Sequence, residues 1–132
     1  MFPCVQGGPV PIDVLVADDS DMMRKAIRKT LGEEPRIRIV GEASNFASTM
    51  QMIADFKPDV LLLDLHLPER RDFPPGFVKS QLVSVNRTVA VSFSNDEEAQ
   101  GLAESYGAEI LLDKMKLYSQ LVPAILQCRA AA

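Results

Sequence analysis

Three aspartates follow two strongly apolar stretches of the sequence. Asp18 and Asp19 come directly after Ile12–Ala17, and Asp64 comes directly after Val60–Leu63. If the two stretches are neighbouring parallel strands, their carboxyl ends meet at one edge of a sheet and the three carboxylates converge there. Carboxylates that lie close together either take up protons or bind a cation. Mg²⁺ prefers such oxygen ligands, so the pattern predicts Mg²⁺ as a cofactor. Asp64 could itself act as a nucleophile and form an acyl phosphate.

Two further polar side chains fall at the ends of later apolar stretches. Ser92 closes the stretch Thr88–Phe93, and Lys114 follows Glu109–Leu112 after Asp113. A hydroxyl, a long-stemmed cation and a metal ion are what a transferring phosphoryl group needs, because its transfer depends on positioning and charge neutralisation. The four strand ends together therefore favour phosphoryl chemistry.

The elements that position these residues alternate between strand and helix patterns. The near-continuous apolar run at 60–63 is typical of a strand buried on both faces. Strands are predicted at Ile12–Ala17, Ile37–Glu42, Val60–Leu65, Thr88–Phe93 and Glu109–Leu112, with helices between them and after the last. Five strands alternating with five helices predict an α/β fold, a doubly wound parallel sheet with helices on both faces.

Capping residues and breakers predict the limits of the helices. Ser20 caps the first helix, which has Met22 on its apolar face and Gly32 at its end, and Ser44 caps the second. The third begins at about Gly76 after two prolines, with Phe77, Leu82 and Val85 left to pack. Asn95 and Glu98 form a capping-box-like start to the fourth. The fifth begins at about Lys116, and Pro123 either kinks it or marks a later start.

Length and composition limit the classes of protein that remain. At 132 residues and 47% hydrophobic content, the chain suits one domain with one sizeable core. Its net charge of −4 and pI near 4.9 argue against direct binding of nucleic acid. The sequence predicts neither a signal peptide nor a membrane span. Two cysteines far apart and a single histidine disfavour a zinc site, and we expect a cytoplasmic protein.

With these motifs assembled, the sequence resembles the receiver domain of bacterial two-component response regulators. The resemblance is carried by Ile12–Ser20, Val60–Pro68, Ser92, Gly107-Ala108 and Asp113-Lys114, including a spacing of 22 residues from Ser92 to Lys114. It spans about residues 12–127. It implies a flavodoxin-like three-layer sandwich with strand order 2-1-3-4-5. Residues 1–11 then form an N-terminal arm, 12–128 the receiver domain, and 129–132 a tail or an artificial end.

The resemblance also implies roles for individual residues. Asp64 matches the phosphoacceptor, and Asp18 and Asp19 match the metal-binding acids. The backbone carbonyl of His66 falls where the family supplies another metal ligand. Ser92 and Lys114 match the groups that engage the phosphoryl group. The implied donor is a sensor histidine kinase or a phosphotransfer protein, and the only chemistry is the chain's own phosphorylation and dephosphorylation.

The implied response is a change in the 95–127 surface, through which the chain forms a homodimer or controls an output. Whether the chain is free-standing or the N-terminal part of a DNA-binding transcriptional regulator stays open. The His66 side chain either affects the lifetime of the acyl phosphate or simply faces solvent, and the second alternative is favoured.

Several positions depart from the family pattern. Phe93 stands where a small residue is usual, so its ring is expected over the mouth of the pocket, where it would slow entry of donor or water. Leu111 stands where a switch aromatic is frequent, and the segment after Pro68 lacks the usual Asp-Gly turn. Met115 replaces a frequent proline.

Phe93 and the altered segment favour one alternative with the same fold, a pseudo-receiver that works as a phosphorylation-independent interaction module. A haloacid-dehalogenase-like phosphatase is disfavoured because His66 stands where its second acid belongs. A flavodoxin-like FMN carrier is disfavoured because the strand-end loops lack a phosphate cradle.

Overall fold

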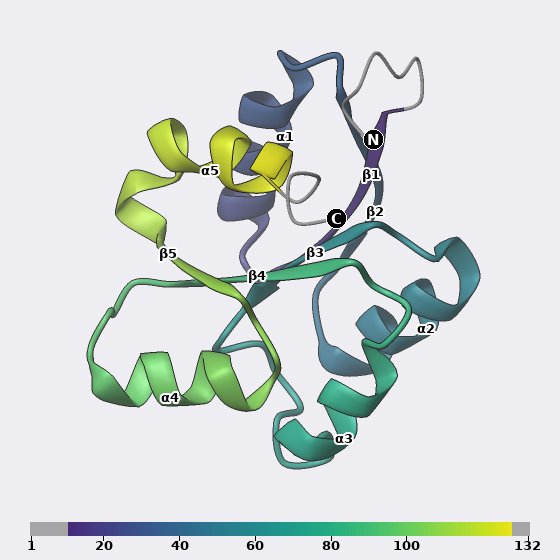
Figure 1. Cartoon of the computed structure of the whole chain (residues 1–132), viewed down its shortest axis with the longest axis vertical. Coiled ribbons are helices and arrows are strands. Elements are labelled where there is room, and N and C mark those ends of the chain that lie inside the picture. The colour runs from purple at the N-terminus through teal and green to yellow at the C-terminus, as the bar shows by residue number, and fades with distance from the viewer. Residues whose placement is uncertain (1–10, 128–132) are drawn as a thin grey trace.

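The computed structural model describes residues 11–127, which form a five-stranded parallel sheet (Figure 1). The strand order is β2-β1-β3-β4-β5, so the predicted α/β fold and its order 2-1-3-4-5 are confirmed. The strands are β1 (Ile12–Ala17), β2 (Ile37–Ala43), β3 (Val60–Asp64), β4 (Arg87–Ser92) and β5 (Ile110–Asp113). Each bound lies within one residue of the predicted one. The predicted arm and tail lie almost wholly outside the described residues.

Helices cover both faces of the sheet, as Figure 1 shows. Helices α1 (Asp21–Gly32) and α5 (Leu117–Leu126) lie on one face. Helices α2 (Phe46–Phe56), α3 (Pro75–Gln81) and α4 (Glu97–Ser105) lie on the other, and a short 3₁₀ helix (Lys114–Lys116) precedes α5. None of the helices described here is both long enough and apolar enough to traverse a bilayer.

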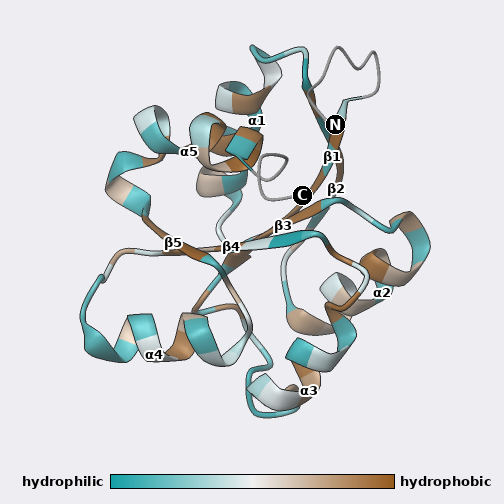
Figure 2. Cartoon of the chain, viewed as in Figure 1, coloured by the Kyte–Doolittle hydropathy of each residue, from teal (hydrophilic) through white to brown (hydrophobic). Residues whose placement is uncertain are grey.

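Two apolar cores result from the alternation of side chains along each strand. Val14 and Val16 pack toward α1 and α5, whereas Leu15 and Ala17 pack toward α2, α3 and α4. The strands therefore carry apolar residues on both faces, which Figure 2 shows as brown ribbon through the middle of the molecule. This packing holds the strand ends, and the polar residues that follow them, in fixed positions.

The register of the central strands brings the predicted site together. Ala17 of β1 lies beside Leu63 of β3, so the residues that follow them, Asp18 and Asp64, are neighbours. On the other side, Ser92 of β4 lies beside Asp113 of β5. All four strand ends therefore open onto the same edge of the sheet, as the sequence predicted.

The helix caps confirm one prediction and correct two. The Ser20 side chain accepts a hydrogen bond from the Met23 amide, as predicted for α1. Helix α2 is capped by Asn45 and not by Ser44, and α4 is capped by Asp96 and not by the predicted pair Asn95 and Glu98. In both corrections the cap is the next polar residue along the chain, because that residue has the extended backbone of an N-cap.

Three further details differ from the predicted packing. Met22, predicted on the apolar face of α1, is exposed. In α3, Val78 is the buried residue and Phe77 is exposed, while Leu82 and Val85 after the helix are buried as predicted. Pro123 does not mark a later start to the last helix, because α5 already runs from Leu117 and continues through it.

Candidate functional site

The three aspartates form one cluster at the ends of β1 and β3. Asp18, Asp19 and Asp64 each offer a carboxylate oxygen, and these oxygens all lie within 4.8 Å of one another. Asp18 and Asp64 are both only 1% exposed, whereas Asp19 faces solvent. The structure thus brings together the acids that the sequence singled out, with two of them buried and one open to the outside.

Backbone amides fix the orientation of the two buried carboxylates. Oδ1 of Asp18 accepts a hydrogen bond from the Ser20 amide at 2.9 Å, and Oδ1 of Asp64 accepts one from the His66 amide at 3.0 Å. Each bond spans two residues and forms a tight turn directly after the strand. Short aspartate side chains favour this local geometry. The turns hold the carboxylates in place at the edge of the sheet.

Lys114 brings a buried cation to the same cluster. Its ammonium Nζ lies 2.8 Å from Oδ2 of Asp18 and 3.3 Å from Oδ1 of Asp64, and its side chain is only 6% exposed. Lys114 follows β5 directly, so the contact joins the end of β5 to the ends of β1 and β3. One buried positive charge therefore faces two buried negative charges.

Burial raises the pKa of the Asp64 carboxyl above its ordinary value. The nearby charge of Asp18 raises this pKa further, while the hydrogen bond from the His66 amide and the positive charge of Lys114 lower it. The rise shows that these two groups do not fully offset the removal of the carboxylate from water. A second positive charge near Asp64 would therefore be stabilising.

The donor set fits a hard divalent cation. Within residues 11–127, Oδ2 of Asp18 is buried and has no partner with hydrogen-bond geometry, although the Lys114 ammonium is close to it. Buried carboxylate oxygens are rarely left in this state. Three clustered carboxylates with one such oxygen match the oxygen ligands that Mg²⁺ takes. The residues present therefore suit the predicted ion.

Ser92 and Phe93 occupy the end of β4, beside these charges. Ser92 is fully buried, and its hydroxyl oxygen accepts a hydrogen bond from the Ser94 amide at 3.0 Å. Strand β4 pairs with β3 so that Val91 lies beside Asp64, which places Ser92 one position beyond the aspartate. Phe93 is 63% exposed, and the centroid of its ring lies 5.1 Å from Nζ of Lys114.

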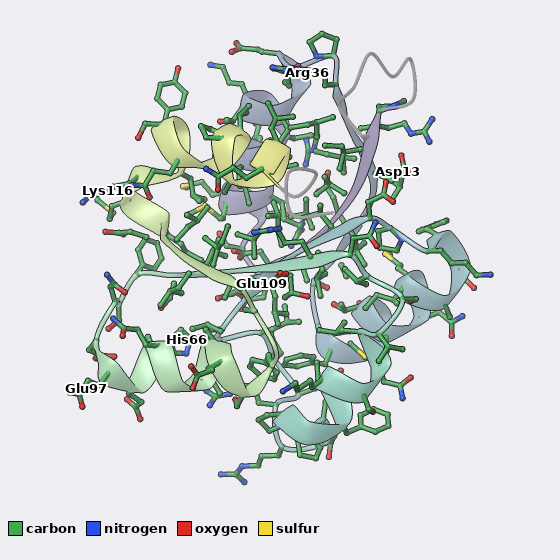
Figure 3. All side chains as sticks on the ribbon, viewed as in Figure 1. Asp13, Arg36, His66, Glu97, Glu109 and Lys116 are labelled. Atoms are coloured by element: carbon green, nitrogen blue, oxygen red, sulfur yellow. The ribbon has the colours of Figure 1, made fainter. Side chains whose placement is uncertain are left out.

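The His66 side chain is exposed, as the favoured sequence interpretation expected. Figure 3 labels it on the side of the sheet that carries α4. It lines a cavity of about 410 Å³ together with Arg70 from the segment after β3, Ser94 and Asp96 from the segment after β4, and Leu102 of α4. The proposed role of its backbone carbonyl as a metal ligand stays a prediction.

Arg24 is a site residue that the sequence analysis did not identify. One of its guanidinium nitrogens donates a hydrogen bond to the Asp18 carbonyl at 2.6 Å, and another nitrogen forms an ion pair with Asp21. Its position one turn into α1 places it over the β1–α1 turn. It belongs to a basic group on α1, made up of Arg24, Lys25, Arg28 and Lys29. Such a group is typical of a helix face in contact with solvent, so the sequence pattern does not predict the contact of Arg24 with Asp18.

Comparisons with known proteins agree with this arrangement. A family model described as the response regulator receiver domain matches residues 14–125. The nitrate/nitrite response regulator protein NarL of Escherichia coli K12 is 31% identical over 120 residues, which cover 91% of this chain and 56% of that protein. A protein-glutamate methylesterase/protein-glutamine glutaminase of Anaeromyxobacter dehalogenans is 31% identical over 109 residues, which cover 82% of this chain and 31% of that protein. The chain thus spans about half or less of these relatives.

Solved structures show the same fold. The signal receiver domain of NarL from Mycobacterium tuberculosis superposes with a TM-score of 0.80 at 27% identity, over 91% of this chain and 97% of that one. CheY6 of R. sphaeroides, solved in complex with the P1 domain of CheA3, superposes with a TM-score of 0.75 at 21% identity, over 93% of this chain and 99% of that one. The second likeness concerns the fold alone.

Proposed function

This chain belongs to the response regulator receiver domain family, and from that premise we propose that it is a phosphoacceptor switch whose phosphorylated residue is Asp64. The observation that carries the proposal is the cluster of Asp18, Asp64 and Lys114, which are buried, with the exposed Asp19, in which opposite charges converge at one edge of the sheet. A carboxylate held by a backbone amide beside a lysine is well placed to attack phosphorus. The same cluster has a donor set that suits Mg²⁺.

In the proposed reaction, a carboxylate oxygen of Asp64 attacks the phosphorus of a phosphohistidine. The new O–P bond forms as the N–P bond breaks, and the released imidazole takes up a proton. Lys114 and the Ser92 hydroxyl bind the phosphoryl oxygens and neutralise their charge. Asp18, Asp19, Asp64 and the His66 carbonyl would hold Mg²⁺, which supplies further neutralisation of the phosphoryl charge.

The phosphodonor is proposed to be a histidine kinase or a phosphotransfer protein that docks on exposed apolar residues near the site. Met22 at the start of α1, Met115 in the 3₁₀ helix and Tyr118 in α5 are each more than three-quarters exposed. Helices α1 and α5 lie on the same face of the sheet, and both begin at the edge that carries the site. The complex of CheY6 with the P1 domain of CheA3 supports a protein partner of this kind.

Phosphorylation is proposed to act through the 95–127 surface. A phosphoryl group adds about −1.5 to −2 charges at neutral pH. If Ser92 and Lys114 engage it better in one conformation, the population shifts toward that conformation. We propose that the output is dimerisation or control of a further domain, such as the DNA-binding part of a transcriptional regulator, because the chain spans only part of NarL. Enzymatic activity beyond self-phosphorylation would belong to such a further domain.

The proposal is tested by incubating the chain with Mg²⁺ and acetyl phosphate and measuring its intact mass. We expect the mass of one phosphoryl group to be added, and we expect no addition to the Asp64→Asn variant. Asp59→Asn is the matched control, because Asp59 precedes β3 at its other end, and this variant should be phosphorylated like the wild type. If the wild-type chain gains no mass and its NMR spectrum does not change on adding beryllofluoride, the phosphoacceptor proposal is refuted. Only the alternative with the same fold, a phosphorylation-independent interaction module, would then remain.

A further inference from the structure

Phe93 and Lys114 are neighbours because of the register between β4 and β5. Ser92 and Asp113 are the last residues of these strands and lie side by side. The residues that follow them, Phe93 and Lys114, therefore leave the sheet together. The ring centroid of Phe93 lies 5.1 Å from Nζ of Lys114, inside the ~6 Å range in which a ring face attracts a cation.

Packing in the apolar cores does not account for the Phe93 ring. The strand that it follows is almost entirely buried, yet Phe93 belongs to neither apolar core and is 63% exposed. The Lys114 side chain beside it is only 6% exposed. The ring is therefore largely exposed to water, whereas the lysine against which it lies is buried. The contact with the ammonium is one that an aromatic ring can make and an aliphatic side chain cannot.

We propose that Phe93 is a positioning residue, whose ring face holds the Lys114 ammonium in place to receive a phosphoryl oxygen. The inference rests on the proposed function, because it assigns Phe93 a part in phosphoryl binding. Lysine has a flexible four-carbon stem, so a fixed ammonium needs contacts on more than one side. Here two carboxylates and one ring provide them.

The ring differs from the two carboxylates in one respect that bears on phosphoryl binding. Asp64 changes its charge when it is phosphorylated, and the attraction of Asp18 for Lys114 weakens when the acids share a divalent cation. The Phe93 ring is uncharged, so its attraction for the ammonium does not depend on either event. It is therefore the contact that can persist while Lys114 turns from the carboxylates to the phosphoryl oxygens.

A series of variants at residue 93 separates attraction by the ring from simple covering of the pocket. Phe93→Tyr keeps the ring face, Phe93→Leu keeps an apolar side chain without a ring, and Phe93→Ala removes both. The measurement is the Kd for beryllofluoride in the presence of Mg²⁺, determined by titration calorimetry. We expect the Tyr variant to match the wild type, and the Leu and Ala variants both to bind about two- to fivefold more weakly.

Two results in this series would overturn the inference. One is a Leu variant that binds beryllofluoride as tightly as the wild type, which would leave only a covering role for Phe93. The other concerns the Lys114→Met background. If Phe93→Leu weakened beryllofluoride binding there as much as it does in the wild type, the ring would not act through the ammonium, because that background has no ammonium to hold.

Proton NMR of the Mg²⁺-free protein tests the contact separately from phosphoryl binding. The Phe93 ring should shift the Lys114 ε-methylene signals, Phe93→Tyr should preserve the shift, and Phe93→Leu should abolish it. Unshifted signals in the wild type would overturn the inference even if Asp64 is phosphorylated. A shifted signal in a chain that does not bind beryllofluoride would refute the proposed function and the phosphoryl role of Phe93, while showing that the ring contact itself exists.

Discussion

The two halves of the site differ in how they are built. The ends of β1 and β3 carry three acids, two of them buried and held by amides of the following turns. The ends of β4 and β5 carry Ser92, Phe93 and Lys114, of which Phe93 is largely exposed. We call these the acidic half and the responding half. The resemblance drawn from the sequence rests on all three aspartates of the acidic half, whereas Phe93 and Leu111 are positions at which the sequence departs from that resemblance.

The two halves differ in how strongly their members depend on one another. In the acidic half each buried charge depends on its neighbours, because removal of one alters the pKa and the partners of the others. In the responding half the exposed ring of Phe93 lies against one partner, the Lys114 ammonium. A change in the acidic half is therefore expected to disturb the whole cluster, whereas a change at Phe93 alters one contact of Lys114.

The largest effect should come from removing a carboxylate of the acidic half. Asp18→Asn and Asp19→Asn should each weaken binding of Mg²⁺ by at least about ten- to a hundredfold, because each removes a charged oxygen from the cluster. Titration calorimetry measures the affinity. Asp113→Asn is the control, since Asp113 ends β5 in the responding half and lies outside the cluster. It should change the affinity for Mg²⁺ by no more than about twofold. If all three variants lost Mg²⁺ affinity equally, the acidic half and the responding half would not differ in metal binding.

Lys114 links the two halves, and its removal should give the next largest effect. Without Mg²⁺, Lys114→Met should lower the free energy of unfolding by about 3 kcal/mol, because two buried carboxylates lose their cation. Mg²⁺ should then stabilise the variant more than the wild type, since the metal no longer competes with the ammonium. Denaturant unfolding with and without Mg²⁺ measures both effects.

Lys116→Met, an exposed lysine of the same 3₁₀ helix, provides the control and should have little effect. If Mg²⁺ stabilised the Lys114 variant and the wild type equally, the ammonium and the metal would not share the carboxylates.

The strands and the acidic half could be predicted from the sequence because they depend on local patterns. A buried strand is a continuous apolar run, and an aspartate directly after it must lie at the edge of the sheet. To predict that the three aspartates meet, one further assumption was needed, that β1 and β3 are neighbours, and the structure confirms it. Ser92 and Lys114 followed from the same reasoning.

Other features could not be predicted because they depend on how segments meet in space. Two adjacent polar residues can each cap a helix, and the direction in which the chain enters decides between them, as at Ser44 and Asn45. Met22 and Met23 are adjacent and alike in type, and only the packed position of α1 decides that Met23 lies against the core while Met22 is exposed. The contact of Phe93 with Lys114 depends on the register of β4 against β5, which no local pattern contains.

The smallest effect concerns the caps of α2 and α4, of which only the second borders the responding half. Asn45 accepts a hydrogen bond from the Ser48 amide, and Asp96 accepts one from the Ala99 amide. The Ala99 amide, together with the Ser94 hydroxyl, lowers the pKa of the Asp96 carboxyl. Asn45→Ala should therefore lower the free energy of unfolding by about 1 kcal/mol at every pH, whereas the cost of Asp96→Ala should depend on pH.

The direction of this dependence follows from the lowered pKa of Asp96. Its folded-state pKa is below its unfolded value, so its stabilisation is fully present above the ordinary aspartate pKa of about 3.9 and is lost as the pH falls through the folded value. Denaturant unfolding at neutral and acidic pH should show the Asp96→Ala deficit shrinking toward low pH, while the Asn45→Ala deficit stays constant. Asp96→Asn keeps an oxygen acceptor without the charge, so its deficit should be smaller than that of Asp96→Ala at neutral pH and should also shrink toward low pH, because only the wild type loses a charge there. A constant Asp96→Ala deficit would mean that the ionised carboxylate gives α4 no advantage over a neutral cap, and the start of the responding half would then be no more sensitive to charge than α2.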